Sequence, residues 1–426
     1  MIDIKLVREN PKAIEADLKK RGDKEKLAWL KELISLDGEY RSLLQEIEAI
    51  RKKRNELTAE VKELMASKKD AKAKILEAKE LPEKIKEMDK ALLLRKERID
   101  FYLMRLPNVL HKSVPIGKDD SQNVMVKEVG KKVSQKNMPP HGELLEKNGW
   151  ADFGRAAKVA GTGFYFLKGD FALLDFALQR FAIDKLMAKG YTLIAPPLIM
   201  NREAYEGVTD LADFENVMYK IEGEDSYLIA TSEHPMAAMY RDEIFAEEDL
   251  PLKLAGVSPC FRREIGAHGV DTRGIFRVHQ FNKVEQFIYC RPEDSWGFHE
   301  ELLKNAEEIF SDLGLAYRVV NICTGDIGVV AAKKYDLEVW MPREEKYREV
   351  VSNSNCTSYQ AVRSNVKLRK KDGSKEYVHT LNSTAIATSR ALRAILETHY
   401  ANGALKIPKA LWPYMNGVKE ILPNEK

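Results

Sequence analysis

Two runs of apolar residues, spaced alternately three and four positions apart, dominate the first hundred residues. The first extends from Leu33 to Leu64 and the second from Ala78 to Leu106. Arg54 and Arg95 occupy seam positions that are otherwise apolar. Spacing of this kind is the heptad pattern of helices that pack side by side along a seam. The pattern therefore predicts two long helices, each of which needs a partner.

A short polar segment, residues 66–70, separates the two runs. Because a short link joins helices of nearly equal length, we expect an antiparallel hairpin. With limbs of about 34 residues and about 1.5 Å of rise per residue, the arm would be roughly 50 Å long. Pro82 lacks the N–H that an interior helical turn needs, so we expect it to kink or interrupt the second limb.

The outer faces of such an arm must meet solvent or a partner, because only the seam is buried. Basic residues follow the middle and the tip of the arm, namely Arg51, Lys52, Lys53, Arg54, Lys62, Lys68, Lys69, Lys72 and Lys74. Taken alone, these charges fit either a solvated helical face or a face that contacts phosphates.

Bulk composition narrows the class of protein. A chain of 426 residues predicts two domains, and a net charge of +3 from 69 basic and 66 acidic residues excludes a histone-like polycation. The four cysteines lie far apart, which argues against zinc and redox sites. Neither a secretory signal core nor a membrane-spanning segment is present, so we expect a cytoplasmic protein without membrane contact.

The rest of the chain reads differently from the arm. We expect an N-terminal helical domain over residues 1–107 with the arm at about 28–106, a connector over 108–160, and a second domain over 161–426. Strand-like runs in the second domain alternate with turns more than with regular helices, which favours an antiparallel sheet flanked by helices. The predicted class is thus α+β. No glycine-rich phosphate loop of the common types occurs.

Residues 258–287 carry the chemistry, and they read as a strand, a loop containing glycine and a second strand. By alternation, Arg262 and Glu264 share a face of the first strand. On the second strand, the residues that share one face are Arg277, His279, Phe281, Lys283 and Glu285. Guanidinium groups suit phosphates, an aromatic ring suits a base and carboxylates suit amino groups. The face fits nucleotide binding or, alternatively, a surface sheet crossed by ion pairs.

Several motifs along the chain resemble class II aminoacyl-tRNA synthetases, and in particular the seryl-tRNA synthetase family. Phe261-Arg262-Arg263-Glu264 resembles the second signature motif of the class, and residues 190–197 resemble the first, a dimer-interface element ending in proline. Residues 381–390 resemble the third. Asp271-Thr272-Arg273-Gly274 with His279-Gln280-Phe281 is similar to the seryl branch. The resemblance covers nearly the whole chain, the helical arm included.

This resemblance implies specific roles in ATP binding. Arg262 would bridge the α-phosphate and the serine carboxylate, and Arg390 would hold the γ-phosphate, so both are assigned as catalytic. Phe281 would stack on adenine and Glu264 would accept from its amino group. The full ATP-binding set that the resemblance implies is Arg262, Arg263, Glu264, Arg277, Val278, Phe281, Glu349, Val350, Val351, Ser352 and Arg390.

The same resemblance implies a serine pocket and a metal site. Thr231-Ser232-Glu233 stands at the family's serine-binding position, and Glu285 and Thr384 complete the pocket. The implied serine-binding set is Thr231, Ser232, Glu233, Arg262, Glu285, Asn382 and Thr384. Glu349 and Ser352 would bind Mg²⁺, which prefers hard oxygen ligands. Zinc, which some methanogen enzymes of this specificity use, is not expected.

The implied reaction is ATP-dependent activation of L-serine, followed by its transfer to tRNA(Ser) and also to tRNA(Sec). In this family a homodimer uses the helical arm to grip the long variable arm of the tRNA, which favours phosphate contact for Arg51–Arg54, Lys62, Lys68 and Lys69. A synthetase-like amino-acid:carrier-protein ligase is the main alternative, although it should lack the arm. The others are a class II enzyme for a different amino acid and a non-catalytic coiled-coil protein.

Overall fold

The computed structural model describes residues 1–211, 215–264 and 274–424. The chain forms two compact units, Met1–Val109 and Leu110–Lys426, and each is described by itself. No helix among the described residues is both long and apolar enough to cross a membrane.

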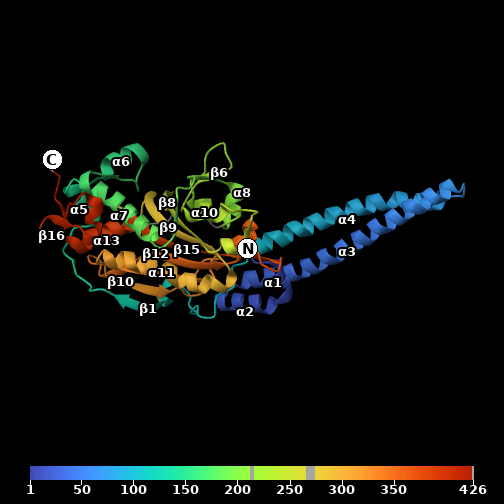
Figure 1. Cartoon of the computed structure of the whole chain (residues 1–426), viewed down its shortest axis with the longest axis horizontal. Helices are drawn as coiled ribbons and strands as arrows, with labels where there is room; N and C mark the ends of the chain where they lie inside the picture. The colour runs from blue at the N-terminus through green and yellow to red at the C-terminus, as the bar shows by residue number, and fades with distance from the viewer. Residues whose placement is uncertain (212–214, 265–273, 425–426) are drawn as a thin grey trace. The chain divides into compact units, whose positions relative to one another are not determined.

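The first unit is helical throughout. Its helices are α1 (Ile4–Glu9), α2 (Pro11–Arg21), α3 (Lys24–Ala66) and α4 (Lys72–Arg105). Figure 1 shows α3 and α4 side by side as a long hairpin. The heptad positions are buried or half-buried, with Leu33, Ile47 and Leu57 buried on α3 and Ile85 and Ile99 on α4. The predicted antiparallel hairpin is therefore confirmed.

The hairpin differs from expectation in two details. Helix α3 has 43 residues because it begins at Lys24, where the Asp23 side chain accepts a hydrogen bond from the Lys26 N–H and so caps the helix. Pro82 lies inside α4, which continues through it to Arg105. Side-chain packing along α3 holds the helix on both sides of Pro82, so the missing backbone hydrogen bond does not interrupt it.

An eight-stranded sheet organises the second unit. In spatial order its strands are β1 (Val124–Val129), β10 (Tyr317–Asn321), β11 (Lys333–Met341), β12 (Lys346–Thr357), β15 (His379–Ala387), β9 (Gln280–Cys290), β8 (Leu252–Phe261) and β4 (Thr192–Ile194). Neighbouring strands are antiparallel except β4 and β8, which are parallel. The predicted α+β class with an antiparallel sheet is confirmed.

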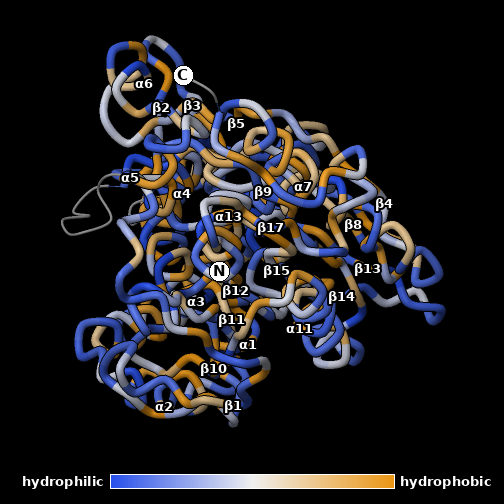
Figure 2. The backbone as a smooth tube through the Cα atoms, turned by 90° about the vertical axis from the view of Figure 1, so that its left-hand side faces the viewer, coloured by the Kyte–Doolittle hydropathy of each residue, from blue (hydrophilic) through white to orange (hydrophobic). Residues whose placement is uncertain are grey.

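Helices pack on both faces of this sheet. Helices α7 (Gly169–Met187), α11 (Ser295–Asp312) and α13 (Thr388–His399) pack on the first face and enclose the main hydrophobic core. A second core lies on the opposite face, under α8 (Arg202–Glu206), α10 (Glu233–Ala238) and α12 (Tyr359–Ser364). Figure 2 shows hydrophobic stretches, in orange, along β8, β10 and α7.

Small elements complete the second unit. They are α5 (His141–Lys147), α6 (Phe153–Ala160), β2 (Ala151–Asp152), β3 (Phe166–Leu167), β5 (Ile199–Asn201), β6 (Ser226–Leu228), β7 (Ile244–Ala246), β13 (Lys367–Arg369), β14 (Lys375–Tyr377), β16 (Tyr400–Ala401), β17 (Ala404–Lys406) and β18 (Glu420–Ile421). Strands β14, β13 and β7 form one sheet, and β5 pairs with β6.

Strand β9 shows how the sheet separates core from cleft. Val284 and Ile288 point toward α7 and α11 and are fully buried. Phe281, Lys283 and Glu285 alternate with them and point to the opposite face. Because this part of the opposite face lies outside the second core, it remains open as a cleft.

The two central strands are shorter than the sequence predicts. Pairing between β8 and β9 ends at Phe261 and Gln280, so Arg277 and Val278 precede the strand. Glu264 lies beyond β8 with φ of +44°, which ends the alternation that would place it beside Arg262. The His279 N–H donates to the Gly163 carbonyl oxygen at 3.0 Å, although its own carbonyl oxygen still accepts the Arg262 N–H at 2.9 Å.

Candidate active site

A polar cleft with a volume of about 300 Å³ opens on the uncovered face of the large sheet. Ligand pockets typically measure about 300–1,000 Å³, so the cleft has the size of a small ligand pocket and is open to solvent on one side. Its walls come from β9, β11, β12 and β15, from the start of α10 and α13, and from the residue after β8. The lining residues are Thr231, Glu233, His234, Arg262, Phe281, Lys283, Glu285, Lys334, Glu349, Val350, Ser352, Asn382, Thr384, Ala387 and Arg390.

Arg262 is held at the rim by its backbone and by its side chain. Its N–H donates to the His279 carbonyl oxygen at 2.9 Å, and its Nε donates to the Ala230 carbonyl oxygen at 3.3 Å. The guanidinium carbon lies 5.4 Å from the centroid of the Phe281 ring. A cation and an aromatic face thus stand together, an arrangement that suits a phosphate next to a planar base.

Arg390 approaches the cleft from the first turn of α13. Its Nη1 donates to the carbonyl oxygen of Glu349 at 2.9 Å and lies 3.4 Å from the Glu349 carboxylate. Burial alone would raise the pKa of Glu349. Attraction to Arg390 and Lys334 outweighs this effect, so the pKa lies below its ordinary value. The carboxylate therefore stays ionised at neutral pH beside two cations.

Glu285 occupies the middle of the cleft floor. In the sheet it lies opposite Gly256 on β8 and opposite Thr384 on β15. Its carboxylate pairs with the ammonium of Lys283 at 2.7 Å, and both side chains are almost fully buried. Burying a charge is costly unless it is paired, so this ion pair keeps the floor polar.

Glu233 forms the wall above Glu285. Its Oε1 accepts hydrogen bonds from Gln360 Nε2 at 3.1 Å and from Asn382 Nδ2 at 3.2 Å. Burial and repulsion from Glu285 raise the pKa of Glu233 to about 7. A carboxylate in this position gains from the arrival of a cation, because a bound ammonium would offset both effects.

A close backbone approach fixes the position of the turn that carries Glu233. A Cβ at Gly256 would lie 2.9 Å from the Cβ of Ser232, so only glycine allows β8 to pass directly under the turn. Ser232 Oγ donates to the Gly256 carbonyl oxygen at 3.3 Å and therefore faces the strand and not the cleft. Thr231 Oγ1 accepts from the Glu233 N–H at 3.1 Å and shapes the turn.

Glu349 and Ser352 both line the cleft from β12, and Asp336 lies opposite Ser352 on β11. Burial raises the pKa of Asp336 to about 7 against the attraction of Lys334, whose ammonium lies 3.2 Å from its carboxylate. The described residues include no group of three or more His, Cys, Asp or Glu side chains positioned to hold a metal ion. All four cysteines are buried.

Known families account for both units of the chain. The model of the seryl-tRNA synthetase N-terminal domain matches residues 1–110, and the model of the tRNA synthetase class II core domain (G, H, P, S and T) matches residues 217–399. The serine–tRNA ligase of Methanocella arvoryzae is 60% identical over 423 residues, covering 98% of this chain and 100% of that protein.

The chain belongs to the seryl-tRNA synthetase family. Solved structures of this class II family agree in fold. The seryl-tRNA synthetase of Pyrococcus horikoshii, complexed with ATP, superposes with a TM-score of 0.94 at 50% identity, covering 100% of both chains. The cytoplasmic serine–tRNA ligase of Naegleria fowleri, in complex with AMP, has a TM-score of 0.89 at 34% identity and covers 100% of this chain and 99% of its own.

Some residues expected in the ATP site of this synthetase lie outside the cleft. Arg263 is exposed, and Glu264 and Arg277 lie 3.9 Å apart as an ion pair. Val278 is buried, and Val350 and Val351 both belong to the main core, although Val350 also lines the cleft. The seryl-type residues Asp271, Thr272 and Arg273 lie outside the described residues.

Other cleft residues of the synthetase were not assigned from the sequence. Lys334 and His234 line the cleft, and Gln360 reaches the Glu233 carboxylate from α12. Alternation along β11 could have placed Lys334 and Asp336 on one face. No signal in the sequence indicates which face of β11 is open, because that depends on where the second core ends.

The basic residues of the synthetase arm fall into two groups. Arg51 donates two hydrogen bonds to Asp89 at 3.0 Å, and Lys53 pairs with Glu77 at 2.5 Å, so both link α3 to α4. Lys52 approaches Glu56 at 4.0 Å, and Arg54 contacts Asn55. Lys62, Lys68 and Lys69 form no ion pair within the described parts of the chain.

Proposed function

We propose that the protein activates L-serine with ATP to form seryl-adenylate and then transfers the serine to the 3′ end of tRNA(Ser), and also to that of tRNA(Sec). One observation carries the proposal. Arg262, Phe281 and Arg390, which suit a nucleotide triphosphate, share a single cleft with Glu233 and Glu285, which suit an amino acid. These residues come from distant parts of the sequence, and the fold brings them together.

Arg262 and Arg390 would stabilise the negative charge of the ATP phosphates during activation. An oxygen of the serine carboxylate attacks the α-phosphorus, the bond from that phosphorus to the bridging oxygen breaks, and pyrophosphate leaves. Arg262 would hold the α-phosphate and the serine carboxylate together, while Arg390 would hold the γ-phosphate. Phe281 lies beside Arg262, where it can stack on adenine. Fixed charge and positioning suffice, and we assign no general base.

The serine pocket follows from polar matching. Glu233, with Thr231 next to it, would accept the ammonium, and Glu285 and Thr384 lie opposite each other where they can bind the hydroxyl. Asn382, which donates a hydrogen bond to Glu233, would orient the Glu233 carboxylate toward the serine ammonium. An amino acid without the hydroxyl would leave buried polar groups unpaired, which a site of this kind rejects strongly. Threonine would be refused mainly by its extra methyl group.

Glu349 and Ser352 are the residues that would hold Mg²⁺. Their oxygens are hard donors, they line the cleft on one strand, and the lowered pKa of Glu349 keeps its carboxylate ready to bind. When bound, the ion would offset charge on the ATP phosphates. The dispersed cysteines argue for a mechanism without zinc.

The helical arm would bind the long variable arm of the tRNA. Lys62, Lys68 and Lys69 are the best candidates for phosphate contacts, because they form no ion pair among the described residues. The ion pairs of Arg51 and Lys53 would compete with phosphate, so these residues, with Lys52 and Arg54, would contribute less. Contacts to backbone phosphates would read the shape of the tRNA more than its bases.

A homodimer is supported by the edge of the sheet. Strand β4 pairs with β8 on one side and ends the sheet on the other. Large apolar side chains on and near it are exposed, with Met187 at 50% and Leu193 at 43%. A second copy would cover these side chains and the free strand edge. We expect the dimer to work in the cytoplasm.

Amino-acid-dependent exchange of pyrophosphate with ATP tests the proposal. We expect exchange with serine and not with threonine, alanine or glycine, and we expect aminoacylation of tRNA(Ser). A carrier-protein ligase is disfavoured because residues 1–110 match a tRNA synthetase domain. If exchange occurs with alanine or glycine alone, the serine assignment fails. If no amino acid supports exchange, the enzymatic assignment fails.

A further inference from the structure

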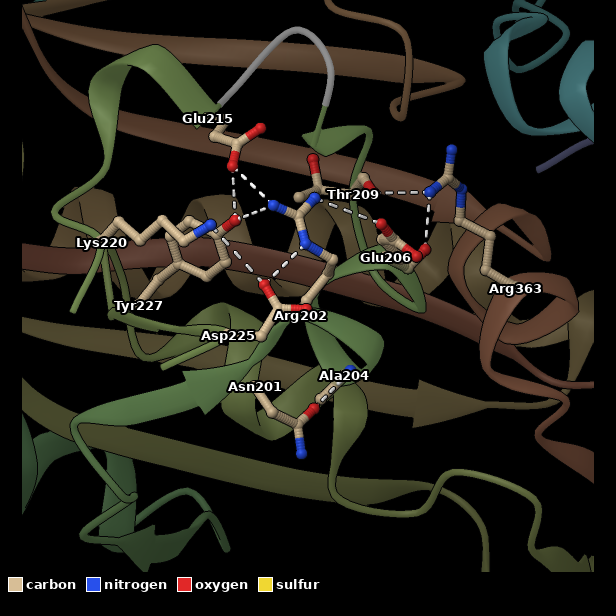
Figure 3. Close-up of polar contacts among 10 residues, drawn as sticks. All are labelled: Asn201, Arg202, Ala204, Glu206, Thr209, Glu215, Lys220, Asp225, Tyr227 and Arg363. Atoms are coloured by element: carbon tan, nitrogen blue, oxygen red, sulfur yellow. Dashed lines mark hydrogen bonds and ion pairs between the residues drawn. The ribbon is translucent and has the colours of Figure 1, made fainter. Parts of the chain in front are cut away.

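Arg202 lies at the centre of a cluster of acidic groups away from the walls of the cleft (Figure 3). It is the first residue of α8. Its Nε lies 2.9 Å from Asp225 Oδ1, its Nη2 lies 2.6 Å from Glu215 Oε1, and its Nη1 lies 3.5 Å from Glu206 Oε1. The Arg202 N–H also donates to the Asp225 carbonyl oxygen at 2.9 Å. A single guanidinium thus joins α8 to two later segments of the chain.

Tyr227 completes this cluster. Its hydroxyl donates to Glu215 Oε1 at 2.5 Å and also contacts Arg202, whose guanidinium lies 5.5 Å from the ring centroid. The ring is fully buried. We call Arg202, Glu206, Glu215, Asp225 and Tyr227 the Arg202 hub. In Figure 3 these side chains point toward one another.

The hub fixes a hairpin over residues 215–229 that contacts the backbone neighbours of Arg262. The carbonyl oxygen of Val217 accepts the Arg263 N–H at 2.9 Å. The hydroxyl of Tyr219 lies 2.6 Å from Nδ1 of His279. The His279 carbonyl oxygen in turn accepts the Arg262 N–H. The hairpin therefore contacts both the residue that follows Arg262 in the chain and the residue that binds its backbone.

The second limb of this hairpin leads into the serine half of the cleft. The carbonyl oxygen of Ile229 accepts the Phe261 N–H at 2.9 Å, and that of Ala230 accepts Arg262 Nε at 3.3 Å. Thr231 and Glu233 follow directly. A displacement of the limb would therefore move the ammonium site and the guanidinium of Arg262 together.

We propose that Arg202 is a positioning residue for activation, which acts through this hairpin to hold the serine and ATP sites in register. The inference rests on the proposed function and adds to it a residue that touches neither substrate. Charge-assisted hydrogen bonds in a fork geometry suit this role, because they fix direction as well as distance. Lysine cannot make the same set of contacts, so Arg202→Lys should restore function only in part.

Three variants of the full-length enzyme separate positioning from simple stability. Arg202→Ala removes the hub. Tyr219→Phe keeps the hub but breaks the hydroxyl contact with His279. Arg291→Ala is the matched control, since Arg291 also pairs with three carboxylates, those of Asp294, Glu293 and Glu247. Arg291 follows the last residue of β9, about 36 Å of extended chain from Gln280.

Serine-dependent exchange is measured for each variant, with rates expressed per active site after titration by adenylate formation. For Arg202→Ala we expect the KM values for serine and for ATP both to rise by about tenfold or more. For Tyr219→Phe we expect about a threefold rise in the KM for ATP and an unchanged KM for serine. Arg291→Ala should match the wild type.

The inference is overturned if Arg202→Ala keeps the wild-type KM values for serine and for ATP, even if it melts at a lower temperature. If Arg202→Ala does not fold, Tyr219→Phe decides, and an unchanged KM for ATP overturns the inference. A wild-type enzyme without serine-dependent exchange would instead contradict the proposed function, and the inference with it.

Discussion

The guanidinium of Arg390 donates to the backbone carbonyl oxygen of Glu349 across 2.9 Å, and the same nitrogen lies 3.4 Å from the Glu349 carboxylate. The contact joins the first turn of α13 to β12. It aims the cation at the cleft while keeping the carboxylate ionised. A phosphate and a metal ion could therefore bind side by side, each next to a group of opposite charge.

Replacing Arg390 with alanine should slow activation severely. The expected loss in kcat/KM for ATP is about 10²–10³-fold, since removal of one preorganised charge contact typically costs that much. Arg390→Lys should recover part of the loss, because lysine keeps the charge without the planar fork. The measurement is serine-dependent exchange. Arg318→Ala, which removes an arginine paired with Glu338 on the neighbouring strand, is the control and should leave the rate unchanged. Equal rates for wild type and Arg390→Ala would contradict the assignment.

Serine use should depend on pH through Glu233. Its pKa is raised to about 7 in the free enzyme, so below that pH the carboxylate is protonated and cannot attract the serine ammonium. We therefore expect kcat/KM for serine to fall about tenfold per pH unit below 7 and to level off above it. Glu233→Gln should have a low value that does not change across this range. A pH step that persists in Glu233→Gln would assign the titration to another group.

Tip lysines of the arm should control tRNA affinity without affecting activation. In the triple variant with Lys62, Lys68 and Lys69 changed to glutamine, the KM for tRNA should rise and its dependence on salt should weaken by roughly 0.7–0.9 per lost contact in the log–log slope. Exchange, which needs no tRNA, should be unchanged. Arg51→Gln, whose guanidinium already pairs with Asp89, should have a smaller effect. An unchanged KM for tRNA in the triple variant would move the contact elsewhere on the arm.

Arg393 should be essential for stability. Its side chain is fully buried, its Nε donates to Glu397 Oε1 at 2.8 Å, and its guanidinium also contacts Glu344. Arg393→Ala leaves the buried Glu397 carboxylate without its cation and leaves Glu344 paired with Arg348 alone. Removing one partner of a buried ion pair typically costs about 3–5 kcal/mol. Denaturant unfolding of the full chain measures the loss. Arg180→Ala, which removes an exposed pair with Asp184, should cost less than about 1 kcal/mol. Similar midpoints for the two variants would contradict this account.

Periodicity explains why the arm could be predicted from the sequence. Each limb has one partner, so the spacing of Leu33 to Leu64 maps directly onto a seam, and even Arg54 is half-buried there. The start of α3 was missed because capping by Asp23 lies outside the heptads. Strand β1 was also missed, since its six exposed residues carry no alternating pattern and depend on pairing with β10.

Alternation predicted part of the cleft and failed where strands end. Phe281, Lys283 and Glu285 share the open face as expected, because they lie within β9. Arg277 and Glu264 do not follow, since the chain leaves the ladder at Gln280 and Phe261. The convergence of Glu349 and Arg390 with Arg262 depends on strand order, which no local pattern records. Only the family resemblance could predict it.

A crystal structure with a non-hydrolysable seryl-adenylate analogue tests the central claim most directly. The account predicts adenine stacked on Phe281, the phosphate-mimicking group at Arg262 and the serine ammonium within hydrogen-bond distance of Glu233. An analogue bound at another place, or bound in the cleft with its ammonium away from Glu233, would contradict it.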